Sequence, residues 1–220
     1  MNDISPDMVF VPLELHGIRL EALAPHHAQG LRAAATDGEL WNLRVTSVPE
    51  PEQVDQYIFK GIEMRPSRFA FAVIDVASGE VLGTTSYHDV LPAIGRLEIG
   101  YTWYAQRCQR SHVNTTCKLL LLAHAFDALG CALVGFRTDN FNHASQAAIE
   151  RLGAKKDGVL RHHALRRDGT VRDTVMYSIT RGEWPEIAAH LRYKLAQRPI
   201  AALPPAGGEG TEAGTKEAPC

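Results

Sequence analysis

The chain has 220 residues, which is enough for one domain with a substantial core and short for two. Its formal net charge of -2 excludes the overall positive field that would hold nucleic acid or an anionic membrane surface. The N-terminal segment has no basic stretch followed by an apolar one, and the apolar runs are too short to span a bilayer. We therefore expect a cytoplasmic protein with no membrane or nucleic-acid partner.

Apolar periodicity and turn residues predict strands and helices in the first half of the chain. Pro25 and Pro51 stand where proline favours the first turn of a helix. Gly100 lies inside an expected strand, where glycine often marks a bulge or a close backbone approach. In chain order, the expected elements are a strand pair or one bent strand over residues 13–23, a helix over 25–35, a helix from 51, and strands over 69–75, 81–88 and 97–104.

The second half contains the clearest helix, over residues 114–129. Leu119, Leu122 and Phe126 recur at helical spacing, and Gly130 ends the pattern. The remaining expected elements are a strand over 132–137, a helix over 144–152, strands over 159–165 and 171–179 joined by an Asp-Gly turn, and a helix over 183–196. This order predicts a single mixed α/β domain.

Both ends of the chain are expected to be flexible, over residues 1–10 and 198–220. After Gln197 the sequence is rich in Pro, Gly, Ala, Glu and Thr and has almost no large apolar residue. Such a segment cannot bury enough surface to offset the entropy of ordering. The ordered domain is therefore expected over residues 11–197.

The four cysteines form no Cys-x-x-Cys pair, and no Cys/His cluster has the spacing of a zinc site. We expect free thiols, with Cys117 and Cys131 buried as small apolar groups, and no metal.

A polar loop over residues 105–112 connects an expected strand to the long helix. The start of a helix presents free backbone N–H groups and the positive end of the helix dipole, which together suit a phosphate group. Arg107 and Arg110 add positive charge beside it. The alternative is an ordinary surface loop that caps the helix.

Residues 97–130, LEIGYTWYAQRCQRSHVNTTCKLLLLAHAFDALG, resemble the core of the GCN5-related N-acetyltransferases. The branch they resemble most is that of the ribosomal-protein N-terminal acetyltransferases of bacteria. Residues 138–154 resemble that family's Asn-x-x-Ser-x-x-Ala-x-x-x-Leu-Gly motif through Asn142, Ser145 and Gly153. The resemblance covers residues 13–184 and implies a central, mixed, mostly antiparallel sheet of about seven strands flanked by helices.

The resemblance implies that acetyl-CoA is the acetyl donor. It places the pyrophosphate of coenzyme A on the loop at residues 109–114, where His112 and Asn114 stand at positions that usually hold glycine or alanine. It places the pantetheine arm beside Asn142 and the sulfur beside Ser145. The expected cofactor-binding residues are Trp103, Tyr104, Gln109, Arg110, Ser111, His112, Val113, Asn114, Thr115, Asn142 and Ser145.

For catalysis, the resemblance favours Glu98 as the general base, with a purely structural carboxylate as the alternative. His88 is the second candidate because the ordinary pKa of histidine suits proton transfer. Ser145 would protonate the departing thiolate. A splay of the strand at residues 100–103 would aim a backbone N–H at the thioester carbonyl.

The function implied is acetyl transfer to a primary amine, on a small molecule or a peptide N-terminus, by direct attack in a ternary complex. Two alternatives stay open. The histidine at position 112 also suits an acyl-CoA-binding regulatory module with little catalysis, and a larger acyl group such as succinyl is a further option. Members of the family are often dimers, so a homodimer is a further expectation.

Overall fold

The computed structural model of the chain describes residues 9–197, Leu203 and Pro204. Its centre is an eight-stranded sheet with the order β1-β2-β3-β4-β5-β6-β8-β7. Neighbouring strands are antiparallel except for β5 and β6, which are parallel. The strands are β1 Leu13–Leu15, β2 Ile18–Ala22, β3 Arg68–Asp75, β4 Val81–Leu91, β5 Arg96–Tyr104, β6 Leu133–Asp139, β7 Lys155–Leu165 and β8 Val171–Thr180.

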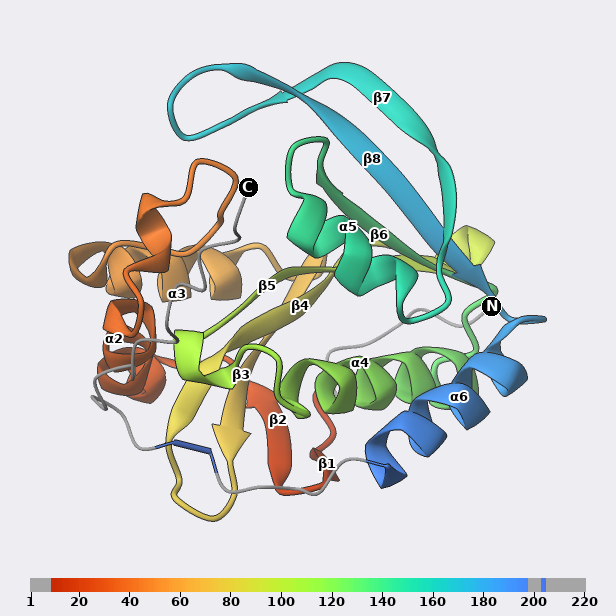
Figure 1. Cartoon of the computed structure of the whole chain (residues 1–220), viewed down its shortest axis with the longest axis horizontal. Coiled ribbons are helices and arrows are strands. Elements are labelled where there is room, and N and C mark those ends of the chain that lie inside the picture. Colours follow the sequence, from red (N-terminus) through yellow and green to blue (C-terminus); the bar gives the residue numbers. More distant parts are fainter. Residues whose placement is uncertain (1–8, 198–202, 205–220) are drawn as a thin grey trace, which may run out of the picture.

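The helices lie on both faces of this sheet (Figure 1). They are α2 Ala28–Thr36, α3 Val54–Glu63, α4 Val113–Ala123, α5 His143–Glu150 and α6 Trp184–Ala196. Short 3-10 turns that begin at Pro25 and Pro51 lead into α2 and α3, as the positions of these prolines predict. In the described part of the chain, no helix combines the length and the apolar character needed to cross a bilayer.

The mixed α/β fold predicted from the sequence is confirmed, with eight strands in place of about seven. The extra strand arises because residues 13–23 fold into two short strands, β1 and β2. Gly17 makes this turn possible, since its backbone has a φ of 73°.

Side chains of β4 alternate between the two faces of the sheet. The Tyr87 hydroxyl donates a hydrogen bond of 2.5 Å to the carbonyl of Leu121 in α4. The hydroxyl of Thr84, on the opposite face, is 2.8 Å from the Tyr57 hydroxyl of α3. Helix α4 therefore covers one face and α3 the other, and α6 packs beside α4 (Figure 1).

Strand β5 carries a bulge in its second half. Thr84 pairs with Trp103, whereas Ser86 pairs with Gly100, so β5 has one residue more than β4 over this stretch. Tyr101, inside the bulge, takes a positive φ of 49°. The irregularity that Gly100 predicted is confirmed.

Strands β5 and β6 separate before this bulge. They pair only over the three residues from Arg96 to Glu98. Strand β6 continues to Asp139 along β8, while β5 follows β4 alone. The parallel pair is thus open toward the carboxyl ends of both strands, where α4 and α5 begin.

The packed core starts earlier in the chain than we expected. Val9 is buried, and Phe10 packs edge-on against Phe69 and Phe71. The sequence predicts a flexible segment over 1–10, and burial of the apolar side chains of these two residues explains the difference. Residues 1–8 and most of 198–220 lie outside the described residues, although Leu203 packs against the core.

Cys117 and Cys131 are buried and carry free thiols, as expected from the sequence.

Candidate functional site

The opening between β5 and β6 holds a cavity of about 900 Å³. Cys108 and Lys118 line it from the side of α4, and His88 lines it from the opposite face of the sheet. The cavity therefore passes through the split and reaches both faces. Its volume is in the range of small-molecule and cofactor sites.

The cavity gathers most of the expected coenzyme A residues. Those that line it are Trp103, Tyr104, Gln109, Arg110, Asn114, Asn142 and Ser145. The others, Ser111, His112, Val113 and Thr115, are absent from its lining. The two groups differ because the start of α4 turns one side toward the cavity and the other toward the protein interior, where Val113 is buried.

The loop before α4 folds without glycine at position 112. His112 has a φ of -72°, a right-handed conformation that any residue adopts. Its ring is buried, which lowers its pKa, and a hydrogen bond with the backbone of His16 opposes that shift. The positive φ falls instead at Arg110, at 60°. Histidine at this position therefore leaves both the loop conformation and the cavity intact.

Ser111 stabilises the start of α4. Its hydroxyl donates to the carbonyl of Cys108 at 2.6 Å and accepts the N–H of Val113 at 3.2 Å. The other N–H groups of the first turn have no partner within the helix, as at any helix start. Together with Arg110 and Asn114, they offer an anion-binding end to the cavity.

Lys118 is a cavity residue absent from the expected set. Its side chain is buried, and its ammonium donates to the hydroxyl of Thr102 at 2.7 Å. No carboxylate among the described residues forms an ion pair with it. Burial lowers the pKa of Lys118 to about 8. A signal for it exists in the sequence, because a lysine stands beside Cys117 and Leu119 inside the most apolar helix.

His88 borders the cavity with a neutral imidazole ring that can donate one hydrogen bond. Arg137 donates to its Nδ1 at 3.1 Å, so in the neutral ring the proton lies on Nε2. Burial, followed by the charge of Arg137, lowers the pKa of His88 to about 4. The ring lies against Gly100, where a Cβ would be 2.3 Å from Nε2. His88 therefore offers an N–H to the cavity and is a poor base at neutral pH.

Glu98 is buried and does not line the cavity. Arg96 donates to its Oε1 at 2.9 Å, and the Nε of Arg137 lies 3.5 Å from its Oε2. The side chain covers Gly135, where a Cβ would lie 2.8 Å from the Cγ of Glu98. This arrangement favours the structural carboxylate over the catalytic base that we expected first.

His88, Asp89 and Glu98 lie close enough together to share a metal ion. Arg137 already joins them, since its Nη2 is 2.8 Å from Asp89 Oδ2 and contacts His88. A guanidinium among these groups leaves little place for a metal cation.

Asn142 and Ser145 combine a structural position with a cavity position. Asn142 caps α5 by accepting the N–H of Ser145 at 3.0 Å. Both residues also line the cavity. The cap fixes the start of α5 at the end of β6, so the first turn of this helix faces the split.

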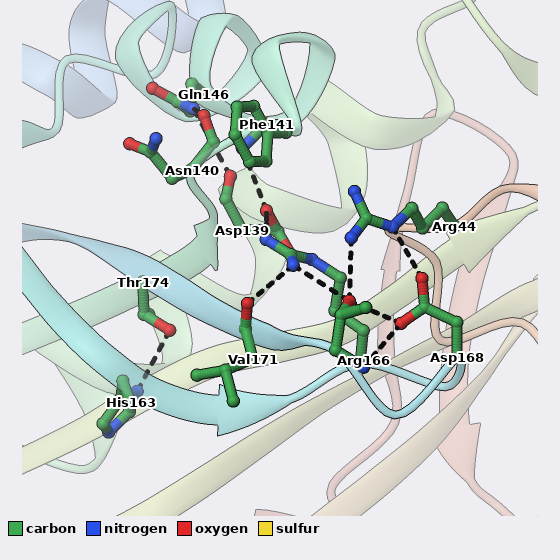
Figure 2. Close-up of polar contacts among 11 residues, drawn as sticks. Arg44, Asp139, Asn140, Phe141, Gln146, His163, Arg166, Asp168, Val171 and Thr174 are labelled. Carbon is green, nitrogen blue, oxygen red and sulfur yellow. Dashed lines mark hydrogen bonds and ion pairs between the residues drawn. The ribbon is translucent and has the colours of Figure 1, made fainter.

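The β7–β8 hairpin closes one end of the cavity and is anchored to β6. Figure 2 shows the guanidinium of Arg166 directed at the carboxylate of Asp139, with hydrogen bonds of 2.7 and 3.1 Å. Burial opposes the charge on Asp139, but the hydrogen bonds from Arg166 and from the N–H of Phe141 outweigh it and lower the pKa of Asp139. The sequence did not reveal this pair, whose members are 27 residues apart.

The tip of the hairpin is also tied to the segment before α3. Arg44 donates to Asp168 at 2.6 Å on the side away from Asp139 (Figure 2). Arg167 donates to the carbonyl groups of Trp41 and Val48. These contacts hold the hairpin beside residues 41–50, so the far end of the cavity has walls from three distant parts of the chain.

Residues 18–155 match the family described as "Acetyltransferase (GNAT) domain". The N-acetyltransferase YoaA of Bacillus subtilis strain 168, itself uncharacterised, is 24% identical over 178 residues, which cover 79% of this chain and 98% of YoaA. A GCN5-related N-acetyltransferase from Brucella melitensis is 29% identical with a TM-score of 0.77, over 85% of this chain and 86% of that one. RimJ of Mycobacterium smegmatis, solved in complex with CoA-disulfide, has a TM-score of 0.68 over 85% of this chain and 94% of its own, and at 21% identity it shows the fold alone. The family match covers more than half of the chain, in agreement with the motifs at residues 97–130 and 138–154, and the chain therefore belongs to the GNAT acetyltransferase family and is an acyltransferase.

Proposed function

We propose that the protein transfers the acetyl group of acetyl-CoA to a primary amine by direct attack in a ternary complex. Acetyl-CoA is the donor used by GNAT acetyltransferases. The observation that carries the proposal is the cavity between β5 and β6, which is lined from both faces of the sheet. A donor held on the α4 side and an acceptor held on the α3 side meet in the split, so no covalent enzyme intermediate is needed.

The start of α4 suits the phosphates of the donor. Unpaired N–H groups and the helix dipole favour anions there, and Arg110 adds a full positive charge. Asn114 in the first turn of α4 and Gln109 in the loop before it contribute polar side chains. The pantetheine arm would then run along the split toward Asn142 on α5.

The chemistry requires the neutral amine nitrogen to attack the acetyl carbon while the carbon–sulfur bond breaks and the sulfur leaves as a thiolate. The nitrogen then gives up one proton to solvent. A backbone N–H of the β5 bulge would polarise the carbonyl. The ammonium of Lys118 would stabilise the thiolate, and its pKa of about 8 is close to the ~8.5 of an ordinary thiol, so it can return a proton to the sulfur. Ser145 is the second candidate for this proton.

The amine would enter in its neutral form. Glu98 does not reach the cavity, and the Nδ1 of His88 accepts a hydrogen bond from Arg137. Neither residue presents a free basic atom to the acceptor. The rate is then expected to rise as the pH approaches the pKa of the acceptor amine itself.

Two classes of acceptor amine are compatible with this proposal. Protein N-termini are the acceptors suggested by the resemblance to the ribosomal-protein branch, and small-molecule amines are the other class. A homodimer and a cytoplasmic location belong to the same proposal.

Thiol release from acetyl-CoA, measured with a panel of peptides and small amines, tests the function. Turnover with a defined acetylated product supports it. If calorimetry detects binding of acetyl-CoA but no amine is turned over, the result indicates an acyl-CoA-binding module with little catalysis. Competition between acetyl-CoA and succinyl-CoA shows which acyl group is transferred.

A further inference from the structure

A second cavity, of about 380 Å³, adjoins the first. The two share residues 45–48, Asp139, Ala164 and Arg172 in their linings. Helix α3 contributes a further wall through Tyr57 and its neighbours, and the tip of the β7–β8 hairpin contributes residues 165–167. The smaller cavity therefore continues the larger one on the α3 face, away from the start of α4.

The charges around this second cavity are unbalanced. Five cationic side chains and one carboxylate line it: Arg44, Lys60, Arg166, Arg167, Arg172 and Asp139.

Three of these cations have acidic partners. Arg44 pairs with Asp168, Arg166 with Asp139, and Arg167 with Glu50.

Within the described residues, neither Lys60 nor Arg172 has an ion-pair partner. Lys60 is exposed to solvent, whereas Arg172 is half-buried. Arg172 is thus the half-buried cation without an ion-pair partner at the junction of the two cavities.

The surroundings of Arg172 favour an anion. Its Nε is buried and has no hydrogen-bond partner among the described residues. Burial lowers the pKa of Arg172, Asp139 opposes that shift, and the charges of Arg137 and Arg166 add to it. An unsatisfied buried donor costs free energy, and a carboxylate is the group that a guanidinium binds best.

We propose that the acceptor is a small amine that carries a carboxylate, and that Arg172 binds this carboxylate at the junction of the two cavities. The inference rests on the proposed acetyl transfer in the larger cavity. The volume of the smaller cavity fits a low-molecular-weight amino acid, in line with the lower end of ligand pockets. The donor phosphates do not compete for Arg172, because their expected site lies at the start of α4 on the other face of the sheet.

Matched pairs of amines with and without the carboxylate test the inference. β-Alanine with its amide, and γ-aminobutyrate with its amide, differ chiefly in this charge. The amide of β-alanine has the less basic amine, so a simple effect of amine protonation would favour the amide. We expect kcat/KM for the acid to exceed that for its amide by about tenfold to a hundredfold, mainly through KM.

Variants of Arg172 locate the source of this preference. Arg172→Gln should bring the ratio of kcat/KM for the acid to kcat/KM for the amide close to one. Arg172→Lys should keep part of the preference for the acid. Since no described residue depends on the Nε of Arg172, the thermal stability of Arg172→Gln should not fall. Arg192→Gln, which removes an exposed arginine from α6, is the matched control and should keep the ratio.

The outcomes separate this inference from the proposed function. Equal turnover of acids and amides overturns the inference and leaves acetyl transfer standing. A preference for phosphoethanolamine, or for peptides without a free carboxylate nearby, also overturns it. If no amine is turned over, the proposed function fails. Binding of β-alanine is then followed by thermal shift in the presence of acetyl-CoA, where a shift lost in Arg172→Gln supports the subsite and no shift overturns it.

Discussion

The ammonium of Lys118 lies 2.7 Å from the hydroxyl of Thr102. This contact joins the interior of α4 to the bulge of β5 at the wall of the cavity between β5 and β6. Thr102 is itself paired with Thr85 of β4 at 2.8 Å, so the lysine is held by neutral groups alone. A buried ammonium without a carboxylate is costly for folding and available to an anionic reaction intermediate.

Replacement of Lys118 by methionine should stabilise the protein. The pKa of Lys118 is about 8 in the folded protein and about 10.5 when the chain is unfolded, so its charged form favours unfolding. This cost is fully present below about pH 8, is on the order of 3 kcal/mol, and disappears as the pH rises toward 10.5. Urea unfolding at about pH 7 and pH 10 should therefore show a gain for Lys118→Met that shrinks at the higher pH.

The same variant should be a poor enzyme. Loss of the cation that stabilises the thiolate is expected to lower kcat by about a hundredfold. In the wild type, the rise of kcat/KM with pH should level off above about pH 8 as Lys118 loses its proton, and Lys118→Met should lack this break in the profile. Lys156→Met, which removes an exposed lysine of β7, should change neither property. Unchanged turnover in Lys118→Met would remove this residue from the mechanism.

His88 should not control the rate at neutral pH. Because its pKa is about 4, it stays neutral down to about pH 5, and its protonation favours the unfolded chain. Stability should consequently fall as the pH drops from about 6.5 to 4, and His88→Gln should reduce that fall. The glutamine oxygen can still accept from Arg137. The pH–rate profiles of the two proteins should have the same shape between about pH 5.5 and 7.5, and an inflection present only in the wild type would restore His88 as the base.

The local elements of this fold could be predicted because they depend on neighbours in sequence. The apolar periodicity of α4, the bulge at Gly100 and the Asn142 cap of α5 are all contained in short segments. The exception among local features is the turn at Gly17, where residues 13–23 were equally typical of one bent strand. The choice between a strand pair and one bent strand depends on the pairing of β2 with β3, which is distant in sequence.

The site could be predicted only in part because its electrostatics depend on the register of distant strands. Glu98 and His88 face each other across β4 and β5, but Arg137 reaches both from β6. Together with burial, this guanidinium lowers the pKa of His88, and together with Arg96 it pairs with the carboxylate of Glu98. Periodicity carries no information about such a contact.

Ser145 should affect turnover more than donor binding. Ser145→Ala is expected to lower kcat by about tenfold if its hydroxyl protonates the thiolate, with little change in the Kd of coenzyme A. Asn142→Ala removes the cap of α5 and should cost about 1 kcal/mol of stability, which Ser145→Ala should not. Calorimetry with coenzyme A, initial rates and thermal melts measure the three effects. Full turnover in Ser145→Ala would leave Lys118 as the proton donor.

Gly83 controls the shape of the β5 bulge from the neighbouring strand. It has a φ of 152°, and a Cβ on it would lie 2.1 Å from the carbonyl oxygen of Trp103. Because that oxygen belongs to the backbone, it cannot move without shifting β5, so Gly83→Ala should destabilise the protein by about 3 kcal/mol. The remaining folded protein should turn over acetyl-CoA more slowly, since the bulge holds the N–H groups proposed for the carbonyl. Gly158→Ala, in β7 with open space around its Cβ, is the control for urea unfolding and rates. Equal stability of the two variants would show that β5 does not depend on this contact.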